Sequence, residues 1–429
     1  MALLGAAAAV ASGLALAPVG ANAAPAKSAT TAAYQVTRPS LPAGEHYACN
    51  APTYPGEMTC DAIYMTGGIA APAAITKPGV AVSAPYNPTD LRSAYDIARA
   101  ARSRGRGVVV AIVDAYRDPN AGNDLSVYRQ HFGLPACTRR NKCLKIVNQN
   151  GRSHLPGASA SWAGEESLDL DMVSAICPHC HILLVEANNS GTRAMGTAER
   201  TAARRAHFVS NSWSGQNFRG EQRFNRDFNH PGHVIDFAAG DRGFGYRNHS
   251  FPFNVAYPTG LPFVTAVGGT SLVNTPSRGR KWTETVWGNK TDAGGATNSG
   301  CTGFARPSWQ KRVTRKLRHC RNRVENDVSA NANPATGVAV YDSYQQVGWV
   351  QYGGTSEATP IITAMWALAG RPGAHAYPVS YLYRHVRDFY DVRSGTNGSC
   401  GVKWLCHAER GFDGPTGLGT PLGIGGLRK

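Results

Sequence analysis

Long apolar runs alternate with stretches of helical periodicity along most of the chain. Residues 107–116, GVVVAIVDAY, form a near-continuous run of Val, Ile and Ala bounded by Gly and a polar loop. Such a run predicts a strand that is buried on both faces, as in a parallel sheet. Similar runs predict further strands at 181–187, 207–213, 233–240 and 262–269.

Helical segments separate these strands. Apolar residues recur at helical spacing in 86–105, where Thr89 or Asp90 can cap the helix, and around 164–176 and 192–206. Alternating helix and strand predicts an α/β fold with a parallel sheet and right-handed crossovers. We find no sequence repeat.

The beginning of the chain has a different character. Residues 1–24 are rich in Ala and Leu and end in Ala21-Asn22-Ala23, a pattern similar to a secretory signal with its cleavage site; a disordered Ala-rich tail is the alternative. Residues 25–85 are rich in Ala, Pro, Gly and Thr with weak periodicity, which indicates a loosely structured extension. We therefore expect a signal peptide at 1–24, a short N-terminal extension at 25–85 and one folded domain at 86–429.

Composition adds a strongly basic character. The 429 residues are 42% hydrophobic, enough for a packed core, and no later segment has about 18 consecutive apolar residues, so we predict no membrane span. The net charge of +16 favours acidic partners such as an anionic cell wall. Much of this charge lies in 311–323, KRVTRKLRHCRNR, which we interpret as a solvated loop. Because it has no interleaved aromatic residues, no nucleic-acid site is expected.

The ten cysteines fall into close neighbours. An even, clustered count in an exported chain indicates disulfide bonds. Proximity predicts the pairs Cys49–Cys60, Cys137–Cys143, Cys177–Cys180, Cys301–Cys320 and Cys400–Cys406.

One of these pairs, in ICPHCHILLVEA at 176–187, has two other interpretations. Cys177 and Cys180 form a CxxC typical of thiol–disulfide enzymes, and His181 extends it to the CxxCH of haem attachment. A redox CxxC opens a helix that follows a strand. Here a predicted helix precedes the pair and a strand follows, so we favour a local disulfide or structural turn. His179 and His181 lack partners at metal-ligand spacing.

The strongest chemical signal is QYGGTSEATPIITAMWALAG at 351–370. Gly353 and Gly354 permit a tight backbone, and Ser356 then stands at the start of an apolar helix. Backbone N–H groups and the helix dipole there suit a nucleophile whose intermediate carries an oxyanion. A simple helix cap formed by Thr355 or Ser356 is the alternative interpretation.

A candidate base comes from WAGEESLDLDMVSAICP at 162–178. Glu165 and Asp169 are four residues apart on a predicted helix and share a face. Two carboxyl groups this close tend to share a proton, which raises one pKa and suits a general base. A solvated acidic face is the alternative, and Glu166, three residues before Asp169, competes for the role of base.

Together these motifs resemble those of the sedolisins, the serine-carboxyl peptidases of the subtilisin-like clan. Subtilisins and sedolisins share the motif Gly354-Thr355-Ser356 with Pro360, but the sequence has no His-Gly pair to supply the subtilisin base. Asp114 ends a predicted strand where a subtilisin keeps its aspartate, yet it has no histidine to orient. The family's spacing of four favours Glu165 over Glu166.

The resemblance implies a three-layer α/β fold, with a central, mostly parallel sheet flanked by helices. It implies a nucleophile, Ser356, activated by Glu165, which Asp169 orients. The loop DFAAGDRGFG at 236–245 resembles the one that supplies an aspartate to the oxyanion hole, here Asp241. Because an anionic carboxylate would repel an oxyanion, Asp241 must act in its protonated form, which favours acidic pH.

The same resemblance implies one structural Ca²⁺ near the C-terminus. FYDVRSGTNG at 389–398 and ERGFDGPTGLGTP at 409–421 resemble the family's calcium loops, whose carboxylate and carbonyl oxygens suit this ion. The implied ligands are the side chains of Asp391 and Asp413 and the backbone carbonyls of Val392, Glu409 and Gly411. Glu409 stands where the family usually has Gly.

We therefore predict a secreted, monomeric serine-type endopeptidase that hydrolyses polypeptides in acid. The segment at 25–85 is shorter than the prodomain that sedolisins usually carry, so a folded inhibitory prodomain is expected to be absent. A catalytically silent protein of this fold that binds anionic cell-wall polymers through the basic loop is the alternative. A redox protein that uses Cys177 and Cys180 is a third hypothesis.

Overall fold

The computed structural model describes residues 38–74, 82–244, 256–275, 279–288, 295–315 and 317–429. These residues belong to a compact unit that spans Gln35–Lys429. The expected signal peptide at 1–24 lies outside the described residues. Within them, no helix combines the length and hydropathy that a bilayer span requires.

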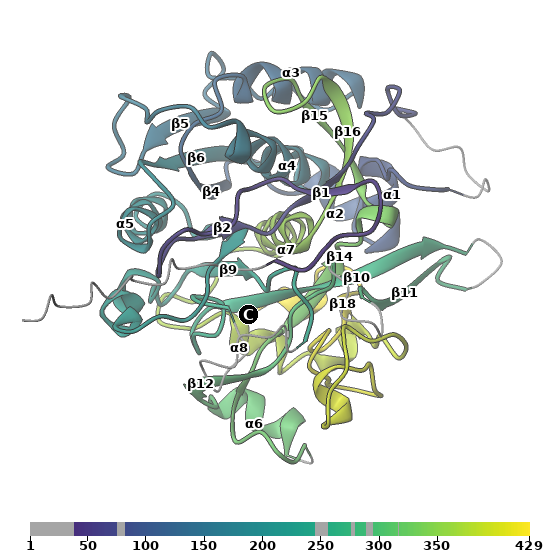
Figure 1. Cartoon of the computed structure of the whole chain (residues 1–429). Coiled ribbons are helices and arrows are strands. Elements are labelled where there is room, and N and C mark those ends of the chain that lie inside the picture. The colour runs from purple at the N-terminus through teal and green to yellow at the C-terminus, as the bar shows by residue number, and fades with distance from the viewer. Residues whose placement is uncertain (1–37, 75–81, 245–255, 276–278, 289–294, 316) are drawn as a thin grey trace, which may run out of the picture. The chain divides into compact units, whose positions relative to one another are not determined.

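One large sheet contains the strands that the apolar runs predict. In chain order its strands are β4 (Val109–Ala115), β5 (Leu144–Asn148), β6 (His181–Ala187), β7 (Phe208–Asn211), β9 (Val234–Ala238), β10 (Thr265–Asn274), β11 (Trp282–Val286) and β14 (Val328–Asn331). Within the described residues they lie in the order β11-β10-β9-β7-β4-β6-β5, with β14 also paired to β10 (Figure 1). All neighbours run parallel except β10 and β11. The mostly parallel sheet confirms the predicted fold class.

Helices α4 (Ala160–Ile176), α5 (Thr192–Ala203) and α7 (Thr355–Ala369) pack against this sheet. The other helices of the described residues are α1 (Pro88–Ala94), α2 (Ala98–Ser103), α3 (Ala121–His131), α6 (Ser308–Thr314) and α8 (Val379–Leu382). The two central helices, α4 and α7, pack against each other and on β4, and α7 also contacts β7, β9 and β14. Helix α5 packs on β4 and β6 and completes the layers.

The crossovers do not all have the same hand. The connection from β4 through α3 to β5 and the connection from β5 through α4 to β6 run in opposite directions along the sheet. Since α3 packs on α4, both helices lie on one side of it. Two such connections must have opposite hands, so the prediction of right-handed crossovers is wrong for one of them.

The helix predicted over 86–105 is interrupted. It divides into α1 and α2 because the backbone of Asp96 has a positive φ of 52°, which no helix accommodates. The N-cap of α1 is Asn87, whose side chain accepts from the N–H groups of Thr89 and Asp90, while Asp90 accepts from the N–H of Asn87. The predicted cap at Thr89 or Asp90 is therefore wrong by two or three positions.

The segment expected to be a loose extension is built into the domain. Strand β3 (Ile63–Met65) pairs with β1 (Glu45–Tyr47) and with β16 (Gly348–Gly353), which also pairs with β15 (Val338–Asp342). Strand β2 (Thr59–Cys60) pairs with β8 (Trp213–Ser214). The expectation for 25–85 is therefore wrong over 38–74, the larger of its two described parts. Strands of two or three residues are too short to leave an alternating pattern in the sequence.

All five predicted disulfides are present. The bridge Cys177–Cys180 is fully buried and closes the turn between α4 and β6. This confirms the interpretation of CPHCH as a local disulfide in a turn. The smaller elements complete the chain: β12 (Cys301–Ala305) pairs with β13 (Asn322–Val324), and β17 (Phe389–Tyr390) pairs with β18 (Thr420–Pro421).

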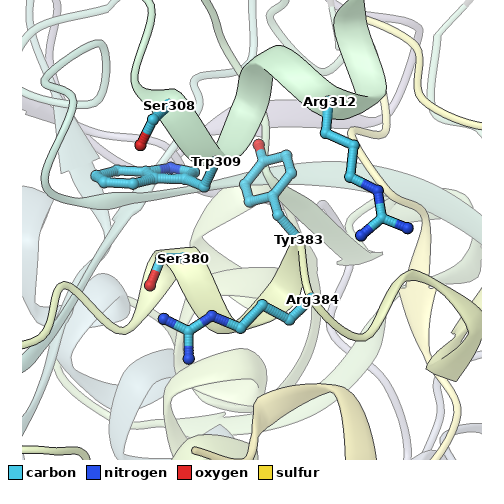
Figure 2. A pocket seen from close by; sticks show the side chains of 6 residues that line it. All are labelled: Ser308, Trp309, Arg312, Ser380, Tyr383 and Arg384. Atoms are coloured by element: carbon cyan, nitrogen blue, oxygen red, sulfur yellow. The ribbon is translucent and has the colours of Figure 1, made fainter.

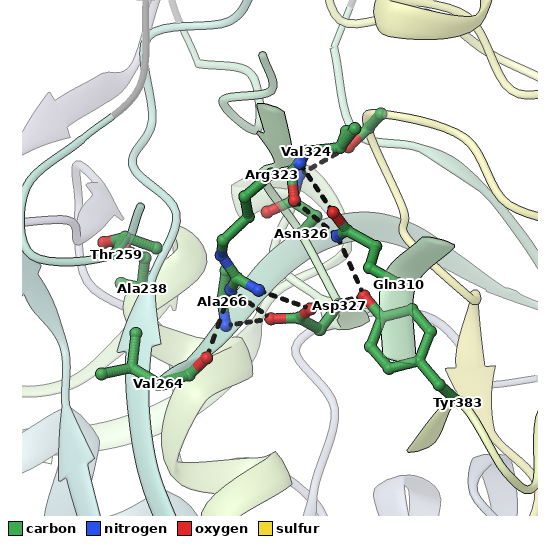
Figure 3. A network of polar contacts seen from close by, with 11 residues as sticks. Ala238, Thr259, Val264, Ala266, Gln310, Arg323, Val324, Asn326, Asp327 and Tyr383 are labelled. Atoms are coloured by element: carbon green, nitrogen blue, oxygen red, sulfur yellow. Dashed lines mark hydrogen bonds and ion pairs between the residues drawn. The ribbon is translucent and has the colours of Figure 1, made fainter. Parts of the chain in front are cut away.

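A buried ion pair holds the loop before β14 (Figure 3). Arg323 Nη2 donates to Asp327 Oδ2 at 2.6 Å and to the carbonyl of Val264 at 3.2 Å. Asp327 also accepts from the N–H of Ala266 at 2.8 Å and from the Tyr383 hydroxyl at 2.5 Å. Both charged side chains are fully buried. Removing one partner would leave the other charge unpaired, at a cost of roughly 3–5 kcal/mol, so the pair fixes the start of β14 firmly.

Candidate active site

Ser356 lies where β16 leads into α7. A glycine is required just before it: Gly354 has a φ of 100°, and a Cβ there would lie 2.2 Å from the carbonyl oxygen of Asp61 and 2.6 Å from Asp241 Oδ2. Ser356 is the second residue of α7 and fully buried. Its backbone N–H is one of the groups that a helix leaves without an intrahelical acceptor, and it donates to the Asp61 carbonyl at 2.9 Å.

The Ser356 hydroxyl contacts a carboxylate and a carbonyl. Its Oγ lies 2.9 Å from Glu165 Oε2 and 2.8 Å from the carbonyl oxygen of Ser212. Glu165 comes from α4, so the packing of α4 against α7 sets the first distance. Only the carboxylate can keep the proton that the hydroxyl donates.

Ser212 was not indicated by any sequence motif, and it links two parts of the site. Pro360 inside α7 has no N–H, so the Ser356 carbonyl lacks its usual helical donor. Ser212 Oγ lies 3.3 Å from this carbonyl oxygen and 2.6 Å from Asp169 Oδ1. The hydroxyl of Ser212 therefore joins Asp169 to the nucleophile's backbone.

Three fully buried carboxyl groups gather beside the nucleophile: Glu165, Asp169 and, at the end of β4, Asp114. Within the described residues, Glu165 Oε1, Asp169 Oδ2 and both Asp114 oxygens lack a hydrogen-bond partner. Burial raises the pKa of Glu165 and of Asp169 well above their ordinary values, and the neighbouring carboxyls raise both further. Burial also raises the pKa of Asp114 to about 8. The sequence analysis gave Asp114 no role because it found no histidine for this aspartate to orient. In the structure, the neighbours of Asp114 are carboxyl groups.

The competing residue, Glu166, is engaged elsewhere. Its Oε1 accepts from the N–H of Asp118 at 3.1 Å. Burial is the main cause that raises the pKa of Glu166 well above its ordinary value, and the negative charge of Glu186 is the next largest cause. Of the two adjacent glutamates, the structure brings Glu165 to Ser356, as the spacing of four implies.

Asp241 lies beside the first residues of α7. Its Oδ1 accepts from the N–H and the hydroxyl of Thr355, both at 2.8 Å, whereas Oδ2 has no partner within the described residues. Burial raises the pKa of Asp241 well above its ordinary value, and the carboxyl of Asp61 raises it further. A protonated Asp241 is therefore favoured, and its unpartnered Oδ2 can donate to an oxygen held by the N–H of Ser356.

Asp61 is the residue of this site that sequence reasoning missed. Its N–H donates to the carbonyl of Ser212 at 3.1 Å, and its carbonyl accepts from Ser356. Burial raises the pKa of its carboxyl to about 6, while the positive charges of Arg242 and Arg38 act in the opposite direction. The one sequence signal for this segment was the Cys49/Cys60 pair, which gave no indication of a place beside the serine.

The residues implied for calcium also come together. Asp391 Oδ1 accepts from the N–H of Gly411 at 2.9 Å, and Asp413 Oδ2 accepts from the N–H of Glu409 at 3.0 Å. The carbonyls of Val392, Glu409 and Gly411 accept no hydrogen bond within the described part of the chain. Within the described residues of the whole chain, no group of three or more His, Cys, Asp or Glu side chains is arranged to hold a metal ion. The Asp391 carboxylate, which also pairs with Arg393 Nε at 2.7 Å, the Asp413 carboxylate and the three carbonyls offer oxygen ligands of the kind that Ca²⁺ prefers.

Known proteins are similar in sequence to much of this chain. The model of the subtilase family matches residues 151–385. Kumamolisin of Bacillus sp. strain MN-32 is 30% identical over 361 residues, which cover 79% of this chain and 62% of kumamolisin. Sedolisin of Pseudomonas sp. strain 101 is 33% identical over 204 residues, which cover 44% of this chain and 33% of sedolisin. The alignments thus span less than two thirds of either relative.

A solved structure extends the likeness to the fold of most of the chain. Pseudomonas sedolisin, a serine-carboxyl proteinase complexed with two molecules of pseudo-iodotyrostatin, superposes with a TM-score of 0.64 at 25% identity. The match covers 79% of this chain and 96% of that one. The family model covers more than half of this chain, and the similar proteins include sedolisin itself. The chain belongs to the subtilase family, in its sedolisin branch.

Proposed function

We propose that this chain is a serine-type peptidase that hydrolyses polypeptides. The 2.9 Å contact between Ser356 Oγ and Glu165 Oε2, at the N-terminus of α7, carries the proposal. A buried carboxylate within hydrogen-bond distance of a serine hydroxyl can remove its proton as the oxygen attacks. A positively polarised helix end suits the anion that forms there.

In the proposed reaction, Ser356 Oγ attacks the peptide carbonyl carbon while Glu165 takes the hydroxyl proton. The carbonyl oxygen becomes anionic and is bound by the N–H of Ser356 and by protonated Asp241. Glu165 then gives the proton to the leaving amine, and water releases the acyl group by the same steps in reverse order. Asp169 and Asp114 lie in the same carboxyl cluster as Glu165, and their charges raise its pKa.

This chemistry sets a pH window. Attack needs Glu165 ionised, so the rate falls at low pH as Glu165 takes up a proton. Oxyanion binding needs Asp241 protonated, so the rate also falls at high pH as Asp241 ionises. Since burial raises the pKa of both groups well above their ordinary values, the proposed working range lies above that of ordinary exposed carboxyls.

Hydrolysis of a denatured protein from pH 2.5 to 8, by the wild type and by Ser356→Ala, tests this function. We expect a bell-shaped profile for the wild type and no hydrolysis by the variant. Equal hydrolysis by both chains, or none by the folded wild type at any pH, would contradict the proposal.

A pocket in the basic region favours a second candidate function, the binding of anionic polymers. Figure 2 shows Arg312 of α6 and Arg384, just after α8, on two sides of the Tyr383 ring. The pocket has a volume of about 460 Å³ and is lined by Ser308, Trp309, Arg312, Ser380, Tyr383 and Arg384. Two guanidinium groups with nearby hydroxyls suit the phosphates or carboxylates of a cell-wall polymer.

The double variant Arg312→Gln/Arg384→Gln is expected to elute from an immobilised poly-glutamate column at clearly lower salt than the wild type. Each lost charge contact reduces electrostatic retention, which salt screens. The control Arg139→Gln/Arg140→Gln removes the same charge from exposed positions outside this pocket. If both double variants elute together, retention reflects net charge and the pocket has no special part in it.

We also propose that the loops around Asp391 and Asp413 hold one Ca²⁺, through their carboxylates and the carbonyls of Val392, Glu409 and Gly411. Such an ion would stiffen the loop, which is tied to the core by Asn326: its Nδ2 donates to the carbonyls of Gly414 and Pro415, both at 3.0 Å. The ion's proposed role is structural, and no step of the reaction passes through it.

Chelation is expected to lower the melting temperature of Ser356→Ala protein, a background that prevents self-digestion. At a calcium concentration about 100 times the dissociation constant, the lost stabilisation is about 2.7 kcal/mol. Asp413→Asn should melt at the same temperature with and without chelator. A melting temperature of Ser356→Ala protein that changes with neither calcium nor chelator would contradict the site.

An extracellular location is part of the proposal. Five disulfides persist in an oxidising environment, and the reducing cytosol would open them.

A further inference from the structure

Asp241 lies in a loop whose backbone is held on both sides by one neighbouring segment. Before Asp241, the carbonyl of Gly240 accepts from the N–H of Asn298 at 2.8 Å. After it, the N–H of Gly243 donates to the carbonyl of Ala296 at 2.9 Å. The position of the Asp241 backbone therefore depends on the segment that contains Ala296 and Asn298.

The side chain of Asn298 adds a contact that depends on its amide group. Its Oδ1 accepts from the N–H of Arg242 at 2.8 Å. Its Nδ2 fills the space beside Gly240, where an added Cβ would overlap with it. The amide of Asn298 thus contacts both the residue before Asp241 and the residue after it.

Buried side chains fix the Asn298 segment from its other side. Asn326 Nδ2 donates to the carbonyl of Asn298 at 2.8 Å. Asn397 Nδ2 donates to the carbonyl of Thr297 at 2.6 Å and to Ser299 Oγ at 2.8 Å. Asn326 and Asn397 are at most 1% exposed. Because these contacts do not involve the Asp241 loop, the segment can act as a support for it.

Asp241 needs such a support because only one of its two carboxyl oxygens has a partner. Its Oδ1 accepts from the N–H and the hydroxyl of Thr355, both at 2.8 Å, whereas Oδ2 has none within the described residues. A carboxyl group that is held at one oxygen can pivot about that contact, so the direction of Oδ2 depends on the backbone that carries it. A donor stabilises an oxyanion only when it is aimed at the place where that oxyanion forms.

We propose that Asn298 is a positioning residue for the oxyanion site: its amide fixes the backbone on both sides of Asp241 and so directs Oδ2 toward the oxyanion. The inference rests on the proposed peptidase function. In this role Asn298 acts through Asp241 and takes up no proton itself. Without the amide, the N–H of Arg242 loses this acceptor and a space opens beside Gly240. Asp241 is then less well aligned and less shielded from water.

The test measures kcat, KM and the pH profile for hydrolysis of a labelled denatured protein by wild type, Asn298→Ala and Asn298→Asp. Asn298→Ala is expected to lower kcat by at least about tenfold and to change KM by less than about threefold, because a misplaced donor weakens binding of the transition state rather than of the substrate. Burial raises the pKa of Asp241, so a less buried Asp241 ionises at lower pH. The high-pH side of the profile should therefore move to lower pH.

Asn298→Asp is the conservative variant. Its carboxyl group keeps an oxygen that can accept from the N–H of Arg242, so we expect kcat to stay within about threefold of the wild type. Its negative charge disfavours ionisation of the nearby Asp241, so the high-pH side of the profile should move to higher pH. The two variants are thus expected to move this side of the profile in opposite directions, which a general loss of stability would not do.

Asn148→Ala is the matched control for lost stability. Asn148 is 8% exposed and Asn298 is 7% exposed. The Oδ1 of Asn148 also accepts from backbone N–H groups, those of Asn150 and Arg152, at 2.9 and 3.0 Å, in the loop after β5. We expect this variant to lower the melting temperature as Asn298→Ala does, and to leave kcat and the pH profile unchanged.

The outcomes separate this inference from the function on which it rests. If wild type hydrolyses the protein and folded Asn298→Ala matches it in kcat and in pH profile, the inference is overturned and the peptidase function stands. An equal loss of kcat from Asn148→Ala would also overturn it. Folded wild type that hydrolyses nothing at any pH would overturn the peptidase function itself. If Asn298→Ala fails to fold, Asn298→Asp decides: a high-pH side that stays at its wild-type position would overturn the inference.

Discussion

Glu165→Gln is expected to lower kcat for peptide hydrolysis by about 10²- to 10⁴-fold, the usual contribution of a general base. The amide of glutamine fits the same space and can still contact Ser356 Oγ, but it cannot take the hydroxyl proton. The nucleophile would then attack as a neutral hydroxyl. Initial rates at the wild-type pH optimum, with protein of matched folding, measure the effect.

Glu166→Gln is the matched control, one position along the same helix. Glu166 is equally buried but contacts Asp118. We expect this variant to retain kcat within about threefold. A larger loss from Glu166→Gln than from Glu165→Gln would show that the 2.9 Å contact to Ser356 does not identify the base.

The free energy of unfolding is expected to be highest in acid and to fall steadily from about pH 4 to about pH 8. Burial raises the pKa of Asp236 on β9 and of Glu199 on α5 from 3.8 and 4.5 to about 8 each. At a pH between the ordinary pKa values and the raised ones, the folded chain keeps protons that the unfolded chain releases. Rising pH therefore favours unfolding. Each such proton contributes a slope of about 1.4 kcal/mol per pH unit. Near and below pH 4 this stabilisation is fully present.

Denaturant unfolding of Ser356→Ala protein across this range measures the slope without self-digestion. Adding Asp236→Asn or Glu199→Gln should reduce the slope by the contribution of about one proton. Asp96→Asn, at an exposed position whose positive φ asparagine tolerates, should leave the slope unchanged. Stability that rises from pH 4 to 7 would contradict the prediction.

The parts of the fold that the sequence predicts well are those where local pattern and tertiary environment agree. Strand β6 has the predicted bounds because residues 182–185 form an apolar run, and the sheet buries every residue of the strand after His181. The pairing of Ser356 with Glu165 was implied by the resemblance to the sedolisins, which rests on a spacing of four on one helix and a glycine-rich helix start. Each of these signals is contained within one segment of the chain.

The missed residues belong to contacts between segments. Ser212 reaches Asp169 because β7 ends beside α4 and α7, and Asp61 reaches Ser356 through strands of two or three residues. Their positions depend on pairing with strands more than a hundred residues away, for which a single sequence carries no local pattern. Likewise, the break at Asp96 depends on how α1 and α2 pack, and apolar spacing alone does not show it.

The disulfides have a consequence for how the chain folds. They join cysteines only 3, 6, 6, 11 and 19 residues apart. Ten cysteines allow on the order of a thousand pairings. Short loops close at the lowest entropic cost. Because each cysteine is bonded to its nearest cysteine in the sequence, the correct bonds are also the ones that form most readily. Oxidation can therefore be completed within separate loops before β4, β6 and α7 assemble. A chain built in this way can acquire its crosslinks in an oxidising environment without relying on an isomerase to correct them.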